Sequence, residues 1–138
     1  MIIDAKHTIL GRLATHAAKQ ALLGEDVTIV NAELAVVTGD KKGIVQAYQR
    51  KYARGVPAKG PFIHRSSDRL VKRAIRGMLP YKTPRGREAL KKIVCYAGVP
   101  EQYKDRETVT VEKAGIDKLP NNKYLTIKQL SKHLGGSP

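Results

Sequence analysis

The sequence is poor in the residue types that build disulfide frameworks, metal sites and base-stacking platforms. Of its 138 residues one is cysteine, one is phenylalanine and none is tryptophan. The single cysteine, Cys95, excludes an internal disulfide and a cysteine-based zinc site, which is typical of a protein from a reducing compartment. The four histidines are scattered without the helical spacing of metal ligands. We therefore expect no metal and no other cofactor.

Long hydrophobic runs are also missing. A membrane-spanning helix needs about eighteen or more consecutive apolar residues, and no such run occurs. The chain opens with Met-Ile-Ile-Asp, without the basic region and apolar stretch of a secretory signal. With 41% hydrophobic and 28% charged residues, the composition is that of an ordinary globular protein. We expect one cytoplasmic domain over residues 1–138.

Acidic residues are scarce in the middle of the chain. Residues 41–92 hold sixteen lysines and arginines against two acids, Asp68 and Glu88, so this window alone carries the net charge of +14. The flanking segments hold ten basic and ten acidic residues, and their charges cancel. Like charge on one segment costs self-repulsion in the folded protein, which a bound polyanion relieves. This imbalance favours a nucleic-acid partner over a basic face that is merely solvated.

The first forty residues predict a parallel α/β unit. Residues 2–5 have the pattern of a short strand, and leucines and alanines recur at helical spacing over residues 10–22. The β-branched runs at 27–30 and 34–38 predict two further strands, apolar enough to be buried on both faces. A strand, a helix and a strand in this order indicate a right-handed parallel crossover.

The rest of the chain predicts mostly helices with basic outer faces. One helix begins at Asp40. A second begins at Ser66 or Ser67, carries Met78 in its buried stripe and ends by Pro80. A third begins at Thr83, with Pro84 at its first helical position, and continues through Ile93 and Val94. Residues 53–65 form a basic loop, residues 107–112 an exposed strand, and Thr126 with Gln129 a capping box before a last helix. In the stretch RGMLPYKTPRGREAL, Gly77 and Gly86 leave room for a closely approaching backbone, including that of a nucleic acid.

No catalytic motif accompanies this basic region. The stretch VVTGDKKG at 36–43 lacks the spacing of a phosphate-binding loop, so nucleotide hydrolysis is not expected. A helix start beside Lys41 and Lys42 either holds an RNA phosphate or is an ordinary glycine turn. Phe62 and Tyr81 lie in basic loops and are the two candidates for stacking on a base. The pattern indicates recognition of the shape and phosphates of folded RNA.

Five ordered segments carry a family resemblance. LGRLATHAAKQALLG (10–24), VTIVNAELAVVTGDK (27–41), GPFIHR (60–65), RGMLPYKTPRGREAL (76–90) and YAGVP (96–100) resemble the universal large-subunit ribosomal protein thirteen family. The resemblance implies a compact α/β domain with a parallel central sheet flanked by helices, and with the basic helices and loop on one side. It also implies a structural constituent of the large subunit, located in the ribosome. The segment RGVPAKGPFIHR is typical of the archaeal and eukaryotic branch of this family. Within that branch, the short length of the chain is typical of the archaeal members.

The resemblance implies large-subunit ribosomal RNA and neighbouring large-subunit proteins as partners, early entry into assembly, and no membrane, no small-molecule substrate and no catalysis. Residues expected from the resemblance to face RNA are Arg54, Lys59, His64, Arg65, Arg69, Arg73, Arg76, Lys82, Arg85 and Arg87. The charge pattern adds Lys41, Lys42, Arg50, Lys51, Lys91 and Lys92.

Two other functions stay open at this stage. A free RNA-binding regulator of translation would need strong sequence discrimination, for which this aromatic-poor surface is badly equipped. An RNA-modifying enzyme would need a cofactor cleft and a catalytic constellation, and the sequence shows neither.

Overall fold

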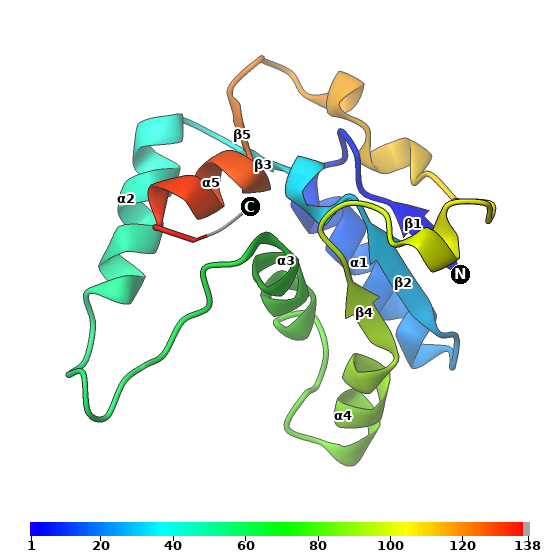
Figure 1. The fold of residues 1–138 in the computed structure, drawn as a ribbon, viewed down its shortest axis with the longest axis horizontal. Helices are drawn as coiled ribbons and strands as arrows, with labels where there is room; N and C mark the ends of the chain where they lie inside the picture. The colour runs from blue at the N-terminus through cyan, green and yellow to red at the C-terminus, as the bar shows by residue number, and fades with distance from the viewer. Residues whose placement is uncertain (137–138) are drawn as a thin grey trace.

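A three-stranded parallel sheet forms the centre of the protein. The computed structural model describes residues 1–136, so the last two positions of the expected domain lie outside the described residues. Strands β1 (Ile2–Asp4) and β4 (Ile93–Cys95) flank β2 (Val27–Val30), and both pairings are parallel. Helix α1 (Leu10–Leu22) connects β1 to β2 (Figure 1). The predicted strand–helix–strand unit and the α/β fold class are confirmed.

Helix α1 owes its place to the small residues on one of its faces. Leu13, Ala14 and Ala17 are fully buried, and the helix packs against α3 and α4. The alanines let these helices approach closely, and the buried leucine supplies about 1.5–3 kcal/mol of burial free energy. The predicted apolar stripe of this helix is confirmed.

A second, two-stranded sheet lies beside the first. Strand β3 (Val36–Thr38) pairs antiparallel with β5 (Tyr124–Thr126), which leads directly into α5 (Ile127–His133). The predicted strand at 34–38 is shorter than expected because a 3₁₀ turn, Ala32–Leu34, precedes it. The capping box of Thr126 and Gln129 at the start of α5 is confirmed.

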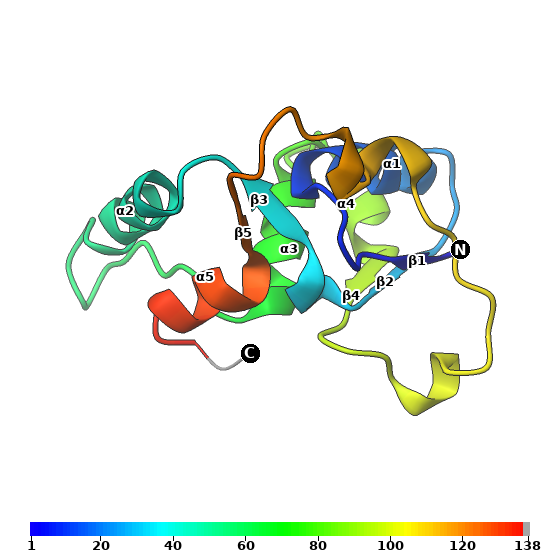
Figure 2. The same ribbon diagram turned by 90° about the horizontal axis from the view of Figure 1, so that it is seen from above.

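The basic region contributes three helices, α2 (Lys41–Tyr52), α3 (Ser67–Arg76) and α4 (Pro84–Lys91). Helix α3 is held to the core by Leu70, Val71 and Ile75, which are almost completely buried. Helix α2 has no fully buried residue and lies at the opposite end of the molecule from β1 (Figure 2). Asp40 and Ser66 occupy the N-cap positions of α2 and α3, but neither side chain makes a capping hydrogen bond.

Three expectations from the sequence are wrong. The helix expected to run through residues 93 and 94 ends at Lys91, because Ile93–Cys95 instead pairs with β2, and Val94 is exposed. Residues 107–112 form no strand, since only Val109 makes a single bridge, to Ile3 of the edge strand β1. Met78, expected in the buried stripe of α3, lies beyond the helix and is exposed.

The remaining segments are short 3₁₀ turns, Glu101–Tyr103, Glu112–Ala114 and Ile116–Lys118. Over residues 1–136, no helix combines the length and the apolar character that crossing a bilayer requires.

Candidate nucleic-acid interface

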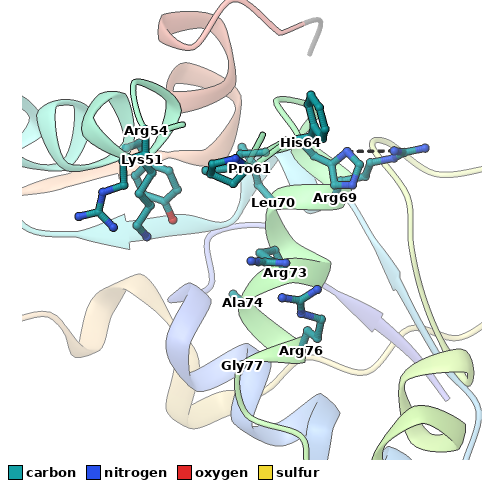
Figure 3. Close-up of a pocket in the computed structure, with 13 residues that line it drawn as sticks. Lys51, Arg54, Pro61, His64, Arg69, Leu70, Arg73, Ala74, Arg76 and Gly77 are labelled. Atoms are coloured by element: carbon teal, nitrogen blue, oxygen red, sulfur yellow. Dashed lines mark hydrogen bonds between the residues drawn. The ribbon is translucent and has the colours of Figure 1, made fainter. Parts of the chain in front are cut away.

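A groove of about 660 Å³ separates the end of α2 from α3 (Figure 3). Its floor and walls come from α2, from the segment 61–64 and from the outer face of α3. We call it the basic groove, and its lining residues are Tyr48, Lys51, Arg54, Pro61, Phe62, Ile63, His64, Arg69, Leu70, Arg73, Ala74, Arg76 and Gly77.

Helical spacing aligns the cations on the α3 wall. Arg69, Arg73 and Arg76 are three or four residues apart, so they share one face of the helix. The opposite face carries Leu70 and Val71, which are buried in the core and fix the rotation of the helix. Amphipathic patterning therefore turns the three guanidinium groups outward together.

The segment between α2 and α3 is tied at its C-terminal end, to α2 and to α5. The Tyr52 hydroxyl donates a hydrogen bond to the carbonyl oxygen of His64. The next carbonyl, that of Arg65, accepts a hydrogen bond from Ser131 Oγ at 2.6 Å, and the Arg65 guanidinium lies 5.2 Å from the centre of the Tyr52 ring. These contacts place His64 at the mouth of the groove, where its Nδ1 accepts a hydrogen bond from Arg69 Nη1 at 3.0 Å.

The cations of the basic groove have no acidic partners. Within residues 1–136 the one ion pair joins Lys118 to Asp117 at 3.9 Å, outside the groove. Two of the cations lie over aromatic rings instead, Lys51 over Tyr48 at 4.8 Å and Arg76 over Tyr81 at 4.5 Å. Such contacts orient a cation without neutralising it, so the groove keeps its positive charge.

The aromatic residues of the region differ in availability. Phe62 is 76% exposed and lines the basic groove, so a ring face is open to a ligand. Tyr81 is half-buried beneath Arg76. Tyr48 and Tyr52 pack partly against the core, and burial raises the pKa of both phenols, with the Arg65 charge acting the other way on the pKa of Tyr52.

The joint between α3 and α4 is built by an N-cap. Thr83 Oγ1 donates to the carbonyl oxygen of Pro80 at 2.7 Å and accepts from the amide of Gly86 at 3.3 Å. Pro84 occupies the first turn, as expected. A Cβ added at Gly86 would lie 1.9 Å from the Pro80 oxygen. The prediction that Gly86 admits a closely approaching backbone is therefore confirmed, and the backbone that fills this space is the protein's own rather than that of a nucleic acid.

The sixteen expected site residues are distributed over a wider area than the groove. Six of them line the basic groove: Lys51, Arg54, His64, Arg69, Arg73 and Arg76. Lys41 and Lys42 line a separate cavity of about 460 Å³ beside His133 of α5. The others with exposed side chains are Arg50, Lys59, Arg65, Lys82, Arg85, Arg87 and Lys91.

The structure adds detail on two lysines of the basic region. Lys92 is half-buried, and its Nζ donates to the carbonyl oxygen of Gly24 at 3.2 Å, so this side chain braces the end of α1. Lys72, absent from the expected set, lines a cavity with His64, Arg69, Arg73 and Arg76. The position of Lys72 on the same helix as Arg69, Arg73 and Arg76 and its positive charge could have identified it from the sequence.

Cys95 is buried in β4, and burial raises the pKa of its thiol to about 12, which suppresses the reactive thiolate. In the part of the chain that the structure describes, no three histidine, cysteine or acidic residues come together as metal ligands.

Comparison with known proteins gives a consistent result. A family model described as Ribosomal protein L13 matches residues 1–102. The large ribosomal subunit protein uL13 of Archaeoglobus fulgidus is 44% identical over 135 residues, covering 97% of this chain and 86% of the relative. The protein of the same name from Methanococcoides burtonii is 46% identical over 134 residues, covering 97% and 96%. That from Natronomonas pharaonis is 41% identical over 137 residues, covering 99% and 92%.

Proposed function

The chain belongs to the ribosomal protein L13 family, within its archaeal branch, and on that premise we propose that it is a structural constituent of the large ribosomal subunit. It works in the cytoplasm as one RNA-binding domain over residues 1–138. Its partners are large-subunit ribosomal RNA and neighbouring large-subunit proteins, and it joins the subunit early in assembly. It catalyses no reaction.

The observation that carries this proposal is the uncompensated charge of the basic groove and the α3–α4 joint. Arg54, Arg69, Arg73 and Arg76 line one hollow, and among residues 1–136 none of them has an acidic side chain within salt-bridge distance. Arginine binds phosphate through two parallel hydrogen bonds, so a row of arginines is suited to hold the phosphates of a nucleic-acid backbone. An RNA strand in the groove supplies the anions that the fold itself lacks.

Readout in the groove rests on backbone geometry and on one aromatic ring. Charged contacts to phosphates position an RNA but carry no sequence information. Phe62, exposed within the basic groove, stacks on an unpaired base, a contact worth about 1–3 kcal/mol and available to any base. The surface is therefore better suited to bind one fixed site on a folded RNA than to select particular messenger RNAs by their sequence.

Sedimentation of the tagged protein after a high-salt wash tests the ribosomal role. Salt weakens loose phosphate contacts, so a peripheral binder leaves the particle. We expect the protein to stay in the large-subunit peak at about one copy per particle. Recovery at the top of the gradient alone would contradict the proposal and favour a free RNA-binding regulator of translation.

Charge reversal tests the surface itself. We expect the triple variant Arg73→Glu, Arg76→Glu and Arg87→Glu to bind large-subunit ribosomal RNA more than about 100-fold more weakly, since each charged hydrogen bond is worth about 1.5–3 kcal/mol. All three side chains reach the surface, so the far-UV circular dichroism spectrum should be unchanged.

The matched control reverses three exposed lysines away from the groove and the joint, Lys104, Lys123 and Lys128. It changes the net charge equally and should lose much less affinity. Equal losses in the two triple variants would show that net charge alone drives binding, and would remove the groove and the joint as the site.

A further inference from the structure

A second cationic groove lies on the outer face of α1, outside the basic region of the sequence. Its volume is about 680 Å³, and its lining residues are Arg12, Thr15, His16, Lys19, Val111, Lys113 and Lys118. We call it the α1 groove. The charge distribution along the sequence does not reveal this groove, because the two flanking segments that form it have no net charge.

Two separate segments are fixed together to form the α1 groove. The guanidinium of Arg12 donates from Nη1 to the carbonyl oxygen of Lys113 at 2.8 Å. Backbone bonds from Ile9 to Ala114 (2.6 Å) and from Ile116 to His7 (3.0 Å) hold the 3₁₀ turns against the start of α1. The relative position of the two segments is therefore fixed by backbone and side-chain hydrogen bonds of the folded protein.

The charges of the α1 groove are almost uncompensated. The acid paired there is Asp117, whose Oδ2 lies 3.9 Å from Lys118 Nζ. Arg12, Lys19 and Lys113 have no acidic partner among residues 1–136. His16 Nε2 is buried without a hydrogen-bond partner in the described chain, so turning this ring toward a ligand breaks no bond at that nitrogen. The groove thus concentrates positive charge around a polar group that is still unsatisfied.

The α1 groove is continuous with the proposed RNA surface. Thr15 and Lys19 also line a neighbouring cavity of about 360 Å³, whose lining includes Met78 and Arg85. Arg85 belongs to the first turn of α4, at the α3–α4 joint. A line of cations therefore leads from the joint over Lys19 to Lys113.

We propose that the α1 groove is a second RNA contact, which binds the phosphate backbone of a strand that continues past the α3–α4 joint. This inference rests on the proposed function, since the same ribosomal RNA occupies both surfaces. The protein then holds its RNA along one extended surface, which runs from the α3–α4 joint over Lys19 of α1 to Lys113.

Salt-dependent binding of the full chain to a transcript of archaeal large-subunit ribosomal RNA tests the inference. The test variant is Lys19→Gln with Lys113→Gln, two side chains with no recorded partner in the described chain. Each phosphate contact contributes about 0.7–0.9 to the slope of log K against log salt. Loss of two contacts should flatten the slope by about 1.4–1.8, equivalent to about 25- to 60-fold in affinity at about 0.1 M salt.

The matched control is Lys104→Gln with Lys123→Gln, which removes the same charge from exposed positions outside both grooves. Its slope should stay close to that of the wild type, and the melting temperatures of both variants should match the wild type. Equal slopes for test and control variants, while charge reversal at Arg73, Arg76 and Arg87 still weakens binding as predicted above, would overturn the second contact and leave the proposed function standing. A wild-type protein without salt-dependent binding would overturn both.

Discussion

At the scale of single residues, Gly86 occupies the tightest point of the α3–α4 joint. A Cβ at this position would lie 1.9 Å from the Pro80 oxygen and 2.8 Å from the Tyr81 nitrogen, both of them backbone atoms that cannot rotate away. We expect Gly86→Ala to lower the free energy of unfolding by about 1–3 kcal/mol, as overpacking does in other cores. Urea denaturation followed by circular dichroism measures the change.

Gly11 provides the matched control, because it also lies within a helix but has no atom within 4 Å of an added Cβ. There the same substitution should stabilise the protein by about 0.5–1 kcal/mol, since alanine loses less backbone entropy than glycine in a helix. A stability loss of similar size in both variants would mean that the Pro80 contact is not what constrains Gly86.

The burial or exposure of single side chains was predicted correctly from the sequence where helical periodicity determines it. The buried Leu13 and the outward Arg69 and Arg73 follow directly from helical spacing. The backbone that approaches Gly86 could not be identified in advance, because it depends on Pro80 folding back onto the next helix. Lys92 was assigned to the RNA surface by its charge, but its bond to Gly24 depends on a contact between distant segments.

At the scale of elements, the helix caps differ in what they contribute. Thr126 Oγ1 accepts from the Gln129 amide and the Gln129 side chain accepts from the Thr126 amide, each at 3.3 Å. We expect Thr126→Ala to cost about 1 kcal/mol of unfolding free energy. Asp40→Ala should cost less than about 0.5 kcal/mol, because Asp40 occupies an N-cap position without a side-chain capping bond. Urea denaturation of the two variants side by side would contradict this ranking if Asp40→Ala proved the more damaging.

Helices and strands were predicted correctly where several local sequence signals agree. The predictions were wrong where pairing with a distant strand determines the secondary structure. The caps at Thr83 and Thr126 and the helix over 10–22 carried several consistent signals, and all three are confirmed. Ile93 and Val94 continue the helical spacing of α4, yet the open edge of β2 draws them into a strand. The alternating run at 107–112 has the pattern of a strand, but it forms one bridge to β1 and no ladder.

At the scale of the whole molecule, the dominant feature is repulsion among like charges. The net charge is +14, and in the part of the chain that the structure describes one ion pair opposes it. Raising the chloride salt from about 0.01 M to about 0.1 M shortens the Debye length from about 30 Å to about 10 Å and screens this repulsion. We therefore expect the melting temperature of the free protein to rise over that range.

Differential scanning calorimetry in chloride buffers measures this effect. Sucrose at equal osmolarity separates charge screening from solvent exclusion. A melting temperature that falls with salt would mean that attractive pairs outweigh the repulsion, contrary to the charge distribution described above.

The surface as a whole was only partly visible in the sequence. The concentration of charge over residues 41–92 located the region, because composition needs no folding information. The basic groove needs Tyr52 and His64 to join α2 to the segment before α3, and the α1 groove needs Arg12 to meet Lys113. Both hollows arise from contacts between segments whose meeting no local pattern encodes.

The hydrogen bond from Ser131 to the carbonyl oxygen of Arg65 also bears on the order in which parts of the fold form during synthesis. Gly136 lies against the same carbonyl, where an added Cβ would be 2.4 Å away, so the segment that enters α3 is clamped by residues made more than sixty positions later. During synthesis from the N-terminus, the sheet of β1, β2 and β4 can close before β5 and α5 exist. The basic groove acquires its clamp only when residues 131–136 have emerged. A nascent chain can therefore pair β1, β2 and β4 before the segment that enters α3 is clamped, and the basic groove reaches its final shape only after the last helix has been made.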